Sequence, residues 1–429
     1  MKILLAGATG FIGGHLLRKL YAQGHHIIAC TRSPERLREL YPDIETLPID
    51  FGQAVAIADW QPHLNGIDAV INAVGLIQET PAQSFGRIHT DAPLALFKAS
   101  ERAGVGRVIQ ISAAGADSAG ATGYYASKGR ADEELSRLDL DWFIIKPSLV
   151  YGPGAKSMGL LRGLAALPRI PLLGDGRQWL QPVHIDDLVD LVLSCLQDGV
   201  PSRLSINAVG PAPVTLADLL QKQRLWLGKP EAKFFSAPEV LVKALPLVGA
   251  WLNEPALNKE AVVMLKQGNT ADAEPFAKRL GRLPKSLDQA LRESAHGQAD
   301  RWHARLYFMR PMLRLAISFV WLWTGWVSAF VYPVADSYRL LEQVGVPAML
   351  HPVFLYGASA LDFALGVATL IGWRLRPVVY CQVALMLIYM IVITATLPEY
   401  WAHPFGPLTK NLPLLAASFV LLVLEEEKP

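Results

Sequence analysis

The chain has 429 residues, of which 52% are hydrophobic and only 18% are charged, so it is long enough for two or three domains with sizeable cores. Its 40 Lys and Arg residues nearly balance its 38 Asp and Glu residues, which gives no concentrated basic surface of the kind that nucleic acids require. We therefore set nucleic-acid binding aside.

Cysteine usage and the N-terminus both bear on the compartment. Cys30, Cys195 and Cys381 are far apart and not in CxxC spacing, so they indicate neither a disulfide framework nor a zinc site. The opening MKILLAGATG has an apolar run too short for a signal peptide. We expect the first domain to stay in the reducing cytoplasm.

From Met1 to about Val150, short β-rich runs alternate with helical stretches, a pattern typical of βαβ units and a parallel sheet. The clearest predicted strands cover residues 2–6, 26–31, 69–72, 107–112 and 142–146. Beyond them, Pro and Gly punctuation and a helical stretch at 216–227 predict a smaller substrate lobe over about 151–300, closing over the carboxyl ends of the strands. Residues 1–300 are thus expected to form one domain.

A glycine-rich turn, GATGFIGG, directly follows the first predicted strand and leads into a helical run at residues 11–23. Glycines spaced in this way permit a tight turn and let backbone N–H groups approach a pyrophosphate, while the helix N-terminus adds partial positive charge. The strand-turn-helix context is the one that a dinucleotide-binding motif requires. We expect the turn to hold the cofactor through Gly7, Thr9, Gly10, Phe11, Ile12 and Gly13.

The end of the second predicted strand bears on the choice between the two nicotinamide cofactors. An NAD-preferring fold places an acid there to hold the ribose 2′-hydroxyl, but this chain has Thr31, Arg32 and Ser33. Arg32 can instead meet a 2′-phosphate. NADP(H) is therefore the preferred cofactor and NAD(H) the alternative, with a merely solvated Arg32 as the competing interpretation.

Further motifs follow in a fixed order: Asp50 after the third strand, NAVG at 72–75, ISAAG at 111–115, YYASK at 124–128, KPSLVYGPG at 146–154 and PVHIDDLV at 182–189. With the glycine turn, they resemble the extended and atypical short-chain dehydrogenase/reductases over roughly residues 1–300. Their order and spacing are most similar to the branch that contains the NADPH-binding accessory subunit of respiratory complex I.

This resemblance implies a Rossmann-type, doubly wound parallel sheet. It implies that Asp50 approaches the adenine, that Asn72, Ala73 and Gly75 line the adenosine ribose, and that Pro147 flanks the nicotinamide. The segment around His184 is structural in this family, so we expect no metal.

Hydride transfer to or from a carbonyl carbon needs a proton at its oxygen, and a phenol supplies it near neutral pH if a neighbouring ammonium lowers its pKa. Tyr124 and Lys128 lie four residues apart, on one face of a helix. We expect Tyr124 to be the acid/base, Lys128 to depress its pKa and hold the cofactor ribose, and Ser112 to bind the substrate oxygen. Tyr125 is three residues from Lys128 and does not fit the family's spacing.

After Arg310 the composition changes sharply. Residues 312–332, 353–373, 377–397 and 408–424 are almost uncharged and predict about four transmembrane helices, an all-α bundle within residues 301–429. Arginines before the first span and in the second connection place both on the inside. A multi-pass protein of a bacterial inner membrane is expected.

This part of the chain resembles the DoxX-like family of small four-helix membrane proteins, chiefly through HPFGPLTKNLPLLAA at 403–417. The resemblance implies an association with quinone-linked electron transfer. Asp362 stands in the middle of the second span, where an ionisable residue is either functional or paired with a neighbouring helix.

The leading hypothesis is a membrane-anchored, NADP(H)-dependent oxidoreductase that acts on a carbonyl or hydroxyl group of a hydrophobic, quinone-like small molecule. One alternative is a nucleotide-sugar epimerase; a dehydratase is disfavoured because Ala113 and Ala114 follow Ser112. The other alternative is an NADPH-binding structural or assembly factor whose partner is a membrane redox complex.

Overall fold

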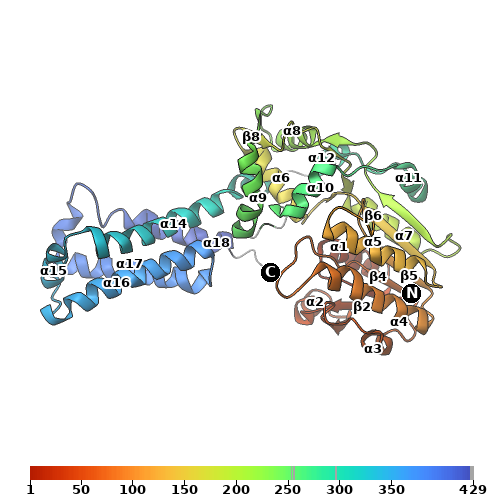
Figure 1. Cartoon of the computed structure of the whole chain (residues 1–429), viewed down its shortest axis with the longest axis horizontal. Helices are drawn as coiled ribbons and strands as arrows, with labels where there is room; N and C mark the ends of the chain where they lie inside the picture. The colour runs from red at the N-terminus through yellow and green to blue at the C-terminus, as the bar shows by residue number, and fades with distance from the viewer. Residues whose placement is uncertain (253, 255–256, 295–296, 426–429) are drawn as a thin grey trace. The chain divides into compact units, whose positions relative to one another are not determined.

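The computed structural model describes residues 1–252, 254, 257–294 and 297–425, in two compact units, Met1–Ala304 and Arg305–Pro429 (Figure 1). Each unit is considered by itself.

The first unit contains a parallel sheet of seven strands in the order β11-β6-β5-β4-β1-β2-β3. The order reverses between β1 and β4, as in a doubly wound Rossmann sheet, so ligands are expected at the carboxyl ends of these two strands. The strands are β1 (Lys2–Ala6), β2 (His26–Thr31), β3 (Glu45–Pro48), β4 (Ala69–Asn72), β5 (Arg107–Ile111), β6 (Trp142–Pro147) and β11 (Leu204–Ala208). All five predicted strands are confirmed, to within one residue at their ends.

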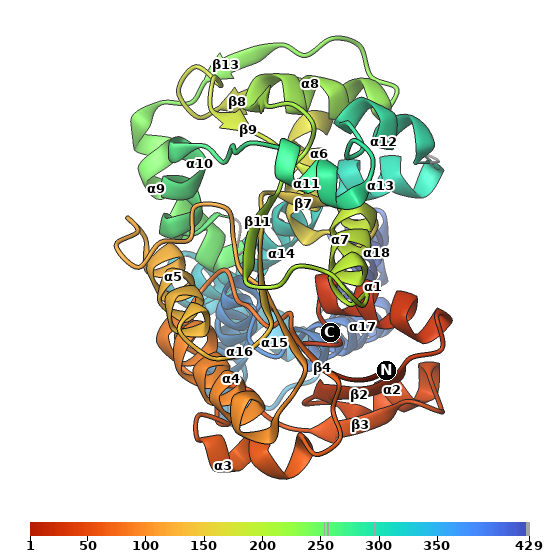
Figure 2. The ribbon, with the colours of Figure 1, turned by 90° about the vertical axis from the view of Figure 1, so that its right-hand side faces the viewer.

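Helices cover both faces of the sheet because alternate strand residues point to opposite sides (Figure 2). Ile3 and Leu5 of β1 pack toward α1 (Phe11–Ala22) and α7 (Ile185–Cys195) in one core. Leu4 and Ala6 pack in a second core, with α4 (Ala92–Ala103) and the C-terminal half of α5 (Gly123–Ser136). Strands buried on both faces explain why the sequence shows apolar runs rather than alternation.

The segment expected to form a separate lobe at 151–300 contributes in part to the sheet. β11 pairs in parallel with β6, and α7 packs against α1 within the same core as β1. The remaining lobe has a core of its own, which includes residues of α6 (Lys156–Ala166), α8 (Leu216–Trp226), α12 (Leu287–Glu293) and α13 (Gln298–Leu306).

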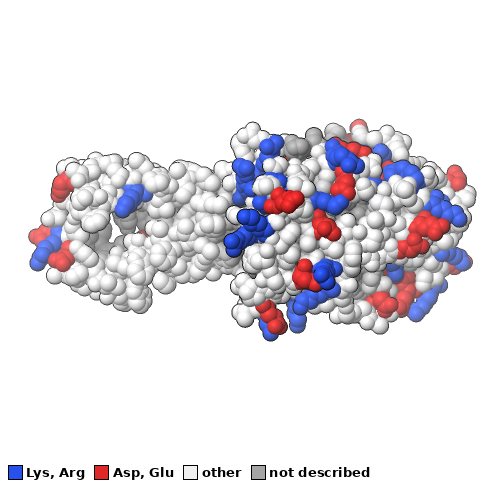
Figure 3. Space-filling view, turned by 90° about the horizontal axis from the view of Figure 1, so that it is seen from above, with Lys and Arg blue, Asp and Glu red and all other residues white. Residues whose placement is uncertain are grey.

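Within the described part of the second unit, three helical segments are long and apolar enough to cross a membrane: Met309–Val331, Ala348–Ile371 and Leu375–Thr396. The fourth expected span is the apolar helix α18 (Asn411–Glu425), whose 15 residues rise only about 22 Å. Three of the four predicted spans are therefore helices of sufficient length and apolar character, and the fourth falls short of the length that a bilayer core requires. Figure 3 shows a broad zone without charged side chains across this unit.

Glycines bring two of these helices, α14 (Met309–Trp326) and α16 (His351–Ile371), into close contact. A Cβ at Gly325 would lie 2.7 Å from the Ser359 carbonyl oxygen, and one at Gly366 would lie 2.8 Å from the Leu322 backbone nitrogen. Small residues permit such backbone approach in membrane helices, where packing rather than burial from water drives association.

Contacts made by two arginines hold the ends of three helices of this unit together. Arg314, near the start of α14, donates to the Leu370 carbonyl at the end of α16 at 2.8 Å. Arg310 pairs with Glu425, the last residue of α18, at 3.3 Å. The start of α14 therefore lies beside the ends of α16 and α18.

Candidate functional site

The glycine-rich turn joins β1 to α1 at the point where the strand order reverses. Gly7 has a φ of +83°, and a Cβ there would lie 2.9 Å from the Ala73 carbonyl carbon after β4. A Cβ at Gly13 would lie 2.0 Å from the Gly7 carbonyl oxygen. Only glycine fits these two positions, and the backbone they create is the one that a pyrophosphate needs.

Helix α1 begins without a side-chain cap, since Gly10 occupies the N-cap position. The N–H groups of Phe11, Ile12 and Gly13 have no acceptor one turn earlier in the helix, as at any helix start. Thr9 and Gly10 are exposed beside them. Partial positive charge and unused donors make this turn fit a dinucleotide phosphate.

The end of β2 presents a cation to solvent. Arg32 is exposed and has no acidic partner within the described chain, whereas the buried Thr31 hydroxyl accepts from the Ser33 N–H at 3.1 Å. Asp50 is also exposed, and its carboxylate accepts from the Gly52 N–H at 3.1 Å. Arg32 is thus available to an anionic group, while Thr31 is committed to a local turn.

Asn72 and Pro147 fix the backbone beside the site through hydrogen bonds. The Asn72 side chain is fully buried, donates to Gln110 at 2.7 Å and accepts from the Val74 N–H at 3.1 Å. It therefore fixes the turn after β4, which leaves Ala73 half-buried and Gly75 exposed. The buried Pro147 accepts the Ala114 N–H at 2.8 Å and holds the ends of β5 and β6 together.

Tyr124 and Lys128 lie on one face of α5, as expected. The Lys128 ammonium is 5.7 Å from the centre of the Tyr124 ring and donates to the Ile111 carbonyl at 3.0 Å. A Cβ at Gly75 would be 3.6 Å from the Lys128 Nζ, so the ends of β4 and β5 and the start of α5 meet at this ammonium. Burial lowers the pKa of Lys128 to about 8.

The pKa of Tyr124 differs from the expectation. Burial first, and then the neighbouring Tyr125, raise the pKa of the Tyr124 phenol above its usual range. Lys128 lies 5.7 Å from the ring centre and spends one donor on Ile111, so its charge does not offset this effect of burial. The phenol is therefore expected to stay protonated at neutral pH.

Ser112 does not fit the role expected of it. Its hydroxyl is 3% exposed and donates to the Asp132 carboxylate at 2.6 Å. Asp132 lies eight residues after Tyr124 on α5, about 12 Å along the helix, and pairs with Lys146 at 3.4 Å. The hydroxyl therefore points into a buried polar cluster.

His89 is a site residue that the sequence did not reveal. Its ring lies 5.3 Å from the Tyr124 ring, and a Cβ at Gly75 would be 3.7 Å from its Nε2. Nε2 accepts the Leu76 N–H at 3.1 Å, so Nδ1 carries the hydrogen and donates to the Ser127 hydroxyl at 3.0 Å. Burial lowers the pKa of His89 to about 2, so the ring is a neutral wall beside Tyr124.

Glu260, near the start of α10 (Lys259–Gln267), caps the helix that carries Tyr124. Its two carboxylate oxygens accept the N–H groups of Gly123 at 3.0 Å and Tyr124 at 2.9 Å, while Thr122 accepts from Tyr125 at 3.2 Å. A carboxylate at a helix N-terminus is favoured by the helix dipole. The lobe thereby holds the start of α5 in place.

We expect Glu260→Gln to lower the free energy of unfolding by about 1–2 kcal/mol, because an amide offers one oxygen and no charge to these two donors. The melting temperature of the full chain in detergent, followed by tryptophan emission, should fall by roughly 2–4 °C. Glu45→Gln, which removes an exposed contact with His26, is the control and should change it little. Equal shifts for both variants would contradict the capping role.

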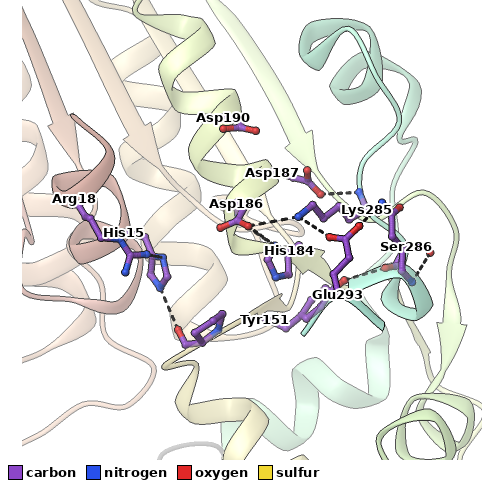
Figure 4. Close-up of polar contacts among 12 residues, drawn as sticks. His15, Arg18, Tyr151, His184, Asp186, Asp187, Asp190, Lys285, Ser286 and Glu293 are labelled. Atoms are coloured by element: carbon purple, nitrogen blue, oxygen red, sulfur yellow. Dashed lines mark hydrogen bonds and ion pairs between the residues drawn. The ribbon is translucent and has the colours of Figure 1, made fainter. Parts of the chain in front are cut away.

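The PVHIDDLV segment forms a polar network with the lobe, shown in Figure 4. Asp187 is fully buried, binds Arg282 at 2.6 Å and accepts the Lys285 N–H at 2.7 Å. Lys285 also pairs with Asp186 at 3.6 Å and Glu293 at 3.0 Å. These contacts join α7 to the lobe and account for the acidic pair in structural terms.

A cleft of about 390 Å³ adjoins this network and is lined by His15, Arg18 and Lys19 of α1 and by residues of α7 and the 282–289 segment. It includes neither Tyr124, Lys128 nor the glycine turn. Two of the residues that line this cleft, Arg282 and Asp190, form an ion pair with each other at 2.9 Å. We place the chemistry at the carboxyl edge of the sheet and not in this cleft.

Both parts of the chain are similar to known proteins. Residues 7–161 match a family described as NAD(P)H-binding, and residues 318–419 match the DoxX-like family. A ceramide reductase of Caulobacter vibrioides is 26% identical over 254 residues, which cover 58% of this chain and 78% of that protein. The mitochondrial 40 kDa subunit of the NADH-ubiquinone oxidoreductase of Neurospora crassa is 23% identical, over 57% of this chain and 67% of that subunit.

Among solved structures, the UDP-glucuronic acid 4-epimerase of Bacillus cereus, in complex with UDP-glucuronic acid and NAD, has a TM-score of 0.52 and is 18% identical. The match covers 72% of this chain and all of that one, and it shows the fold alone.

The fold and the matched segment indicate a nicotinamide-dinucleotide-binding, Rossmann-type domain that is similar to the short-chain dehydrogenase/reductases, and its relatives include reductases and epimerases. In this chain, that domain is joined to a C-terminal DoxX-like domain whose apolar helices indicate a membrane protein.

Proposed function

We propose that the protein is a membrane-anchored, NADP(H)-dependent reductase that acts on a carbonyl group of a hydrophobic substrate. The observation that carries this proposal is the meeting of Tyr124, Lys128 and Gly75 at the carboxyl edge of the sheet that also carries the glycine turn. A proton donor, a cation and a dinucleotide-binding turn are the groups that carbonyl reduction requires.

Bound NADPH would supply the hydride to the substrate carbonyl carbon. The Tyr124 hydroxyl gives its proton to the carbonyl oxygen, so that one carbonyl becomes one alcohol. Its raised pKa keeps the phenol protonated at neutral pH, which favours reduction over oxidation. Lys128 supports the tyrosinate that is left and offers its remaining N–H donors to the cofactor ribose, while His89 walls the ring.

The substrate class rests on context. A relative is named a ceramide reductase, and the domain is joined to membrane helices, so a lipid-soluble carbonyl compound or a quinone-like molecule fits best. We propose an inner-membrane location with the Rossmann domain in the cytoplasm. Arg310 and Arg314 at the start of α14 support this orientation, as do Arg374 and Arg376, which follow α16.

One observation favours a second candidate function. Because Ser112 is committed to Asp132, the described site lacks the hydroxyl that the family uses on the substrate oxygen. An NADPH-binding structural or assembly factor of a membrane redox complex would not need this hydroxyl. The similarity to the 40 kDa subunit of a respiratory oxidoreductase supports this candidate.

Cofactor binding is tested first. The full chain in detergent is titrated with NADPH and with NADH, and the fluorescence of the bound nucleotide is followed. We expect NADPH to bind at least tenfold more tightly, about 1.4 kcal/mol, and Arg32→Glu to abolish this preference. Arg38→Glu, on the exposed surface of α2 (Pro34–Leu40), is the matched control and should keep the preference. If neither nucleotide binds the unmodified protein, the reductase proposal fails.

A further inference from the structure

The helix α9 (Glu239–Leu252) of the lobe presents an unusual amount of apolar side chain to its surroundings. Val240 is 77% exposed, Leu247 is 76% exposed and Leu241 is 56% exposed. Its only charged residues, Glu239 and Lys243, form an ion pair with each other at 3.0 Å. Soluble monomers rarely expose a cluster of large apolar residues without a partner.

This helix is held to the rest of the lobe by strand pairing and close packing. The strand before it, β13 (Phe234–Ser236), pairs with β8 (Ile170–Leu172), whose Ile170 and Leu172 are buried in the lobe's core. A Cβ at Gly249 would lie 2.7 Å from the Leu257 Cβ, so α9 is also fixed against the turn that leads into α10. Figures 1 and 2 both show α9 beside α10. The exposed apolar side is therefore a stable surface.

The lobe is also the part of the first unit that is tied most directly to the membrane. Ala304 is 2% exposed and belongs to the lobe's core, and the first candidate span begins at Met309. The four residues between these positions give five Cα–Cα steps, which can extend by at most about 18 Å. The last helix before the span carries exposed Arg301, Trp302 and Arg305, residue types that favour a bilayer interface.

We propose that α9 is an interfacial helix, whose apolar side, formed by Val240, Leu241, Leu247 and Val248, inserts into the boundary between lipid headgroups and acyl chains. A short tether that holds the lobe at the bilayer makes lipid the partner that this surface meets first. The exposed Phe234 and Phe235, directly before the helix, extend the same apolar surface.

Membrane contact at α9 also bears on the substrate, and this step rests on the proposed function. The neighbouring α10 supplies Glu260, which caps the Tyr124 helix. It also supplies Met264, which like Tyr124 packs against the small cluster that contains Tyr125. An inserted α9 therefore brings the bilayer boundary to the side of the lobe that adjoins the site. The substrate class that fits is an amphiphile whose carbonyl lies near the headgroups.

The test uses the full chain in phosphatidylcholine vesicles, with single cysteines introduced as Val240→Cys or Leu247→Cys. Cys381→Ala removes the exposed native thiol, while Cys30 and Cys195 are buried. Each variant is labelled with the polarity-sensitive fluorophore NBD, and lipids that carry a doxyl quencher near the headgroup are included or omitted. We expect blue-shifted emission and at least twofold quenching by the doxyl lipid at both positions.

Ser136→Cys, exposed at the end of α5, is the matched control and should show neither effect. Emission at both α9 positions that stays in the polar range and is unaffected by doxyl lipid overturns the proposal. Blue-shifted but unquenched emission also overturns it, because the helix would then be covered by protein, such as a second copy of the chain. Neither readout needs cofactor or turnover, so failure here is distinguishable from failure of the reductase proposal.

Discussion

Gly13→Ala should abolish nucleotide binding, with the affinity for NADPH falling at least 100-fold, about 2.7 kcal/mol. The added Cβ would lie 2.0 Å from the Gly7 carbonyl oxygen, and that atom belongs to backbone that cannot rotate away. The turn must open, and the N–H groups of Phe11 and Ile12 then lose the arrangement that receives a pyrophosphate. Titration of the full chain with NADPH measures the effect.

The neighbouring glycine offers a matched control. A Cβ at Gly14 would lie 3.7 Å from the Ala8 carbonyl oxygen, an ordinary contact, so Gly14→Ala should bind NADPH nearly as well as the unmodified chain. Both variants add one methyl group to α1, one residue apart, and differ only in what that group meets. If Gly13→Ala retained full affinity, the turn would not be the phosphate site.

Tyr124→Phe should reduce turnover by about 10²–10⁴-fold while NADPH still binds, because the variant removes the proton donor and no backbone group. NADPH oxidation is measured with the full chain in lipid vesicles, against a panel of long-chain carbonyl lipids and quinones. A selective effect on kcat would indicate that the phenol acts in the transition state.

Tyr125→Phe distinguishes this role from a general loss of packing. Tyr125 is 5% exposed and contacts the Gly115 region rather than the Lys128 side of α5, so its variant should retain most of the turnover. If both tyrosine variants turned over normally and still supported growth of the cell, the structural or assembly role would be the better account.

Local features of this protein could be predicted from the sequence. The first strand, the turn and α1 follow one another within 22 residues, so glycine spacing and the apolar run suffice to identify them. The proximity of Tyr124 and Lys128 could also be predicted, because residues four positions apart on a helix lie on the same face. These predictions depend on contacts between near neighbours.

Features that depend on distant partners could not be predicted. The place of Ser112 after β5 suggested a catalytic role. Its hydroxyl instead donates to Asp132, which lies 20 residues later on another element. β11 is short and contains the polar residues Ser205 and Asn207, and only its pairing with β6 reveals it as a sheet strand. His89 and Glu260 belong to the site through contacts that no local spacing encodes. The fourth predicted span began at residue 408, whereas α18 begins at Asn411, after Thr409 and Lys410.

The cap at the start of α5 also has a consequence for the order in which the protein becomes competent during synthesis. Glu260 lies 136 residues after Tyr124, so the ribosome must complete the lobe before the tyrosine helix gains its carboxylate cap. The glycine turn needs no such wait, since Gly7 meets Ala73 early in the chain. Contacts of long sequence separation form late in folding. A nascent chain should therefore acquire its nucleotide turn well before its tyrosine helix is locked, shortly before the first apolar span is translated.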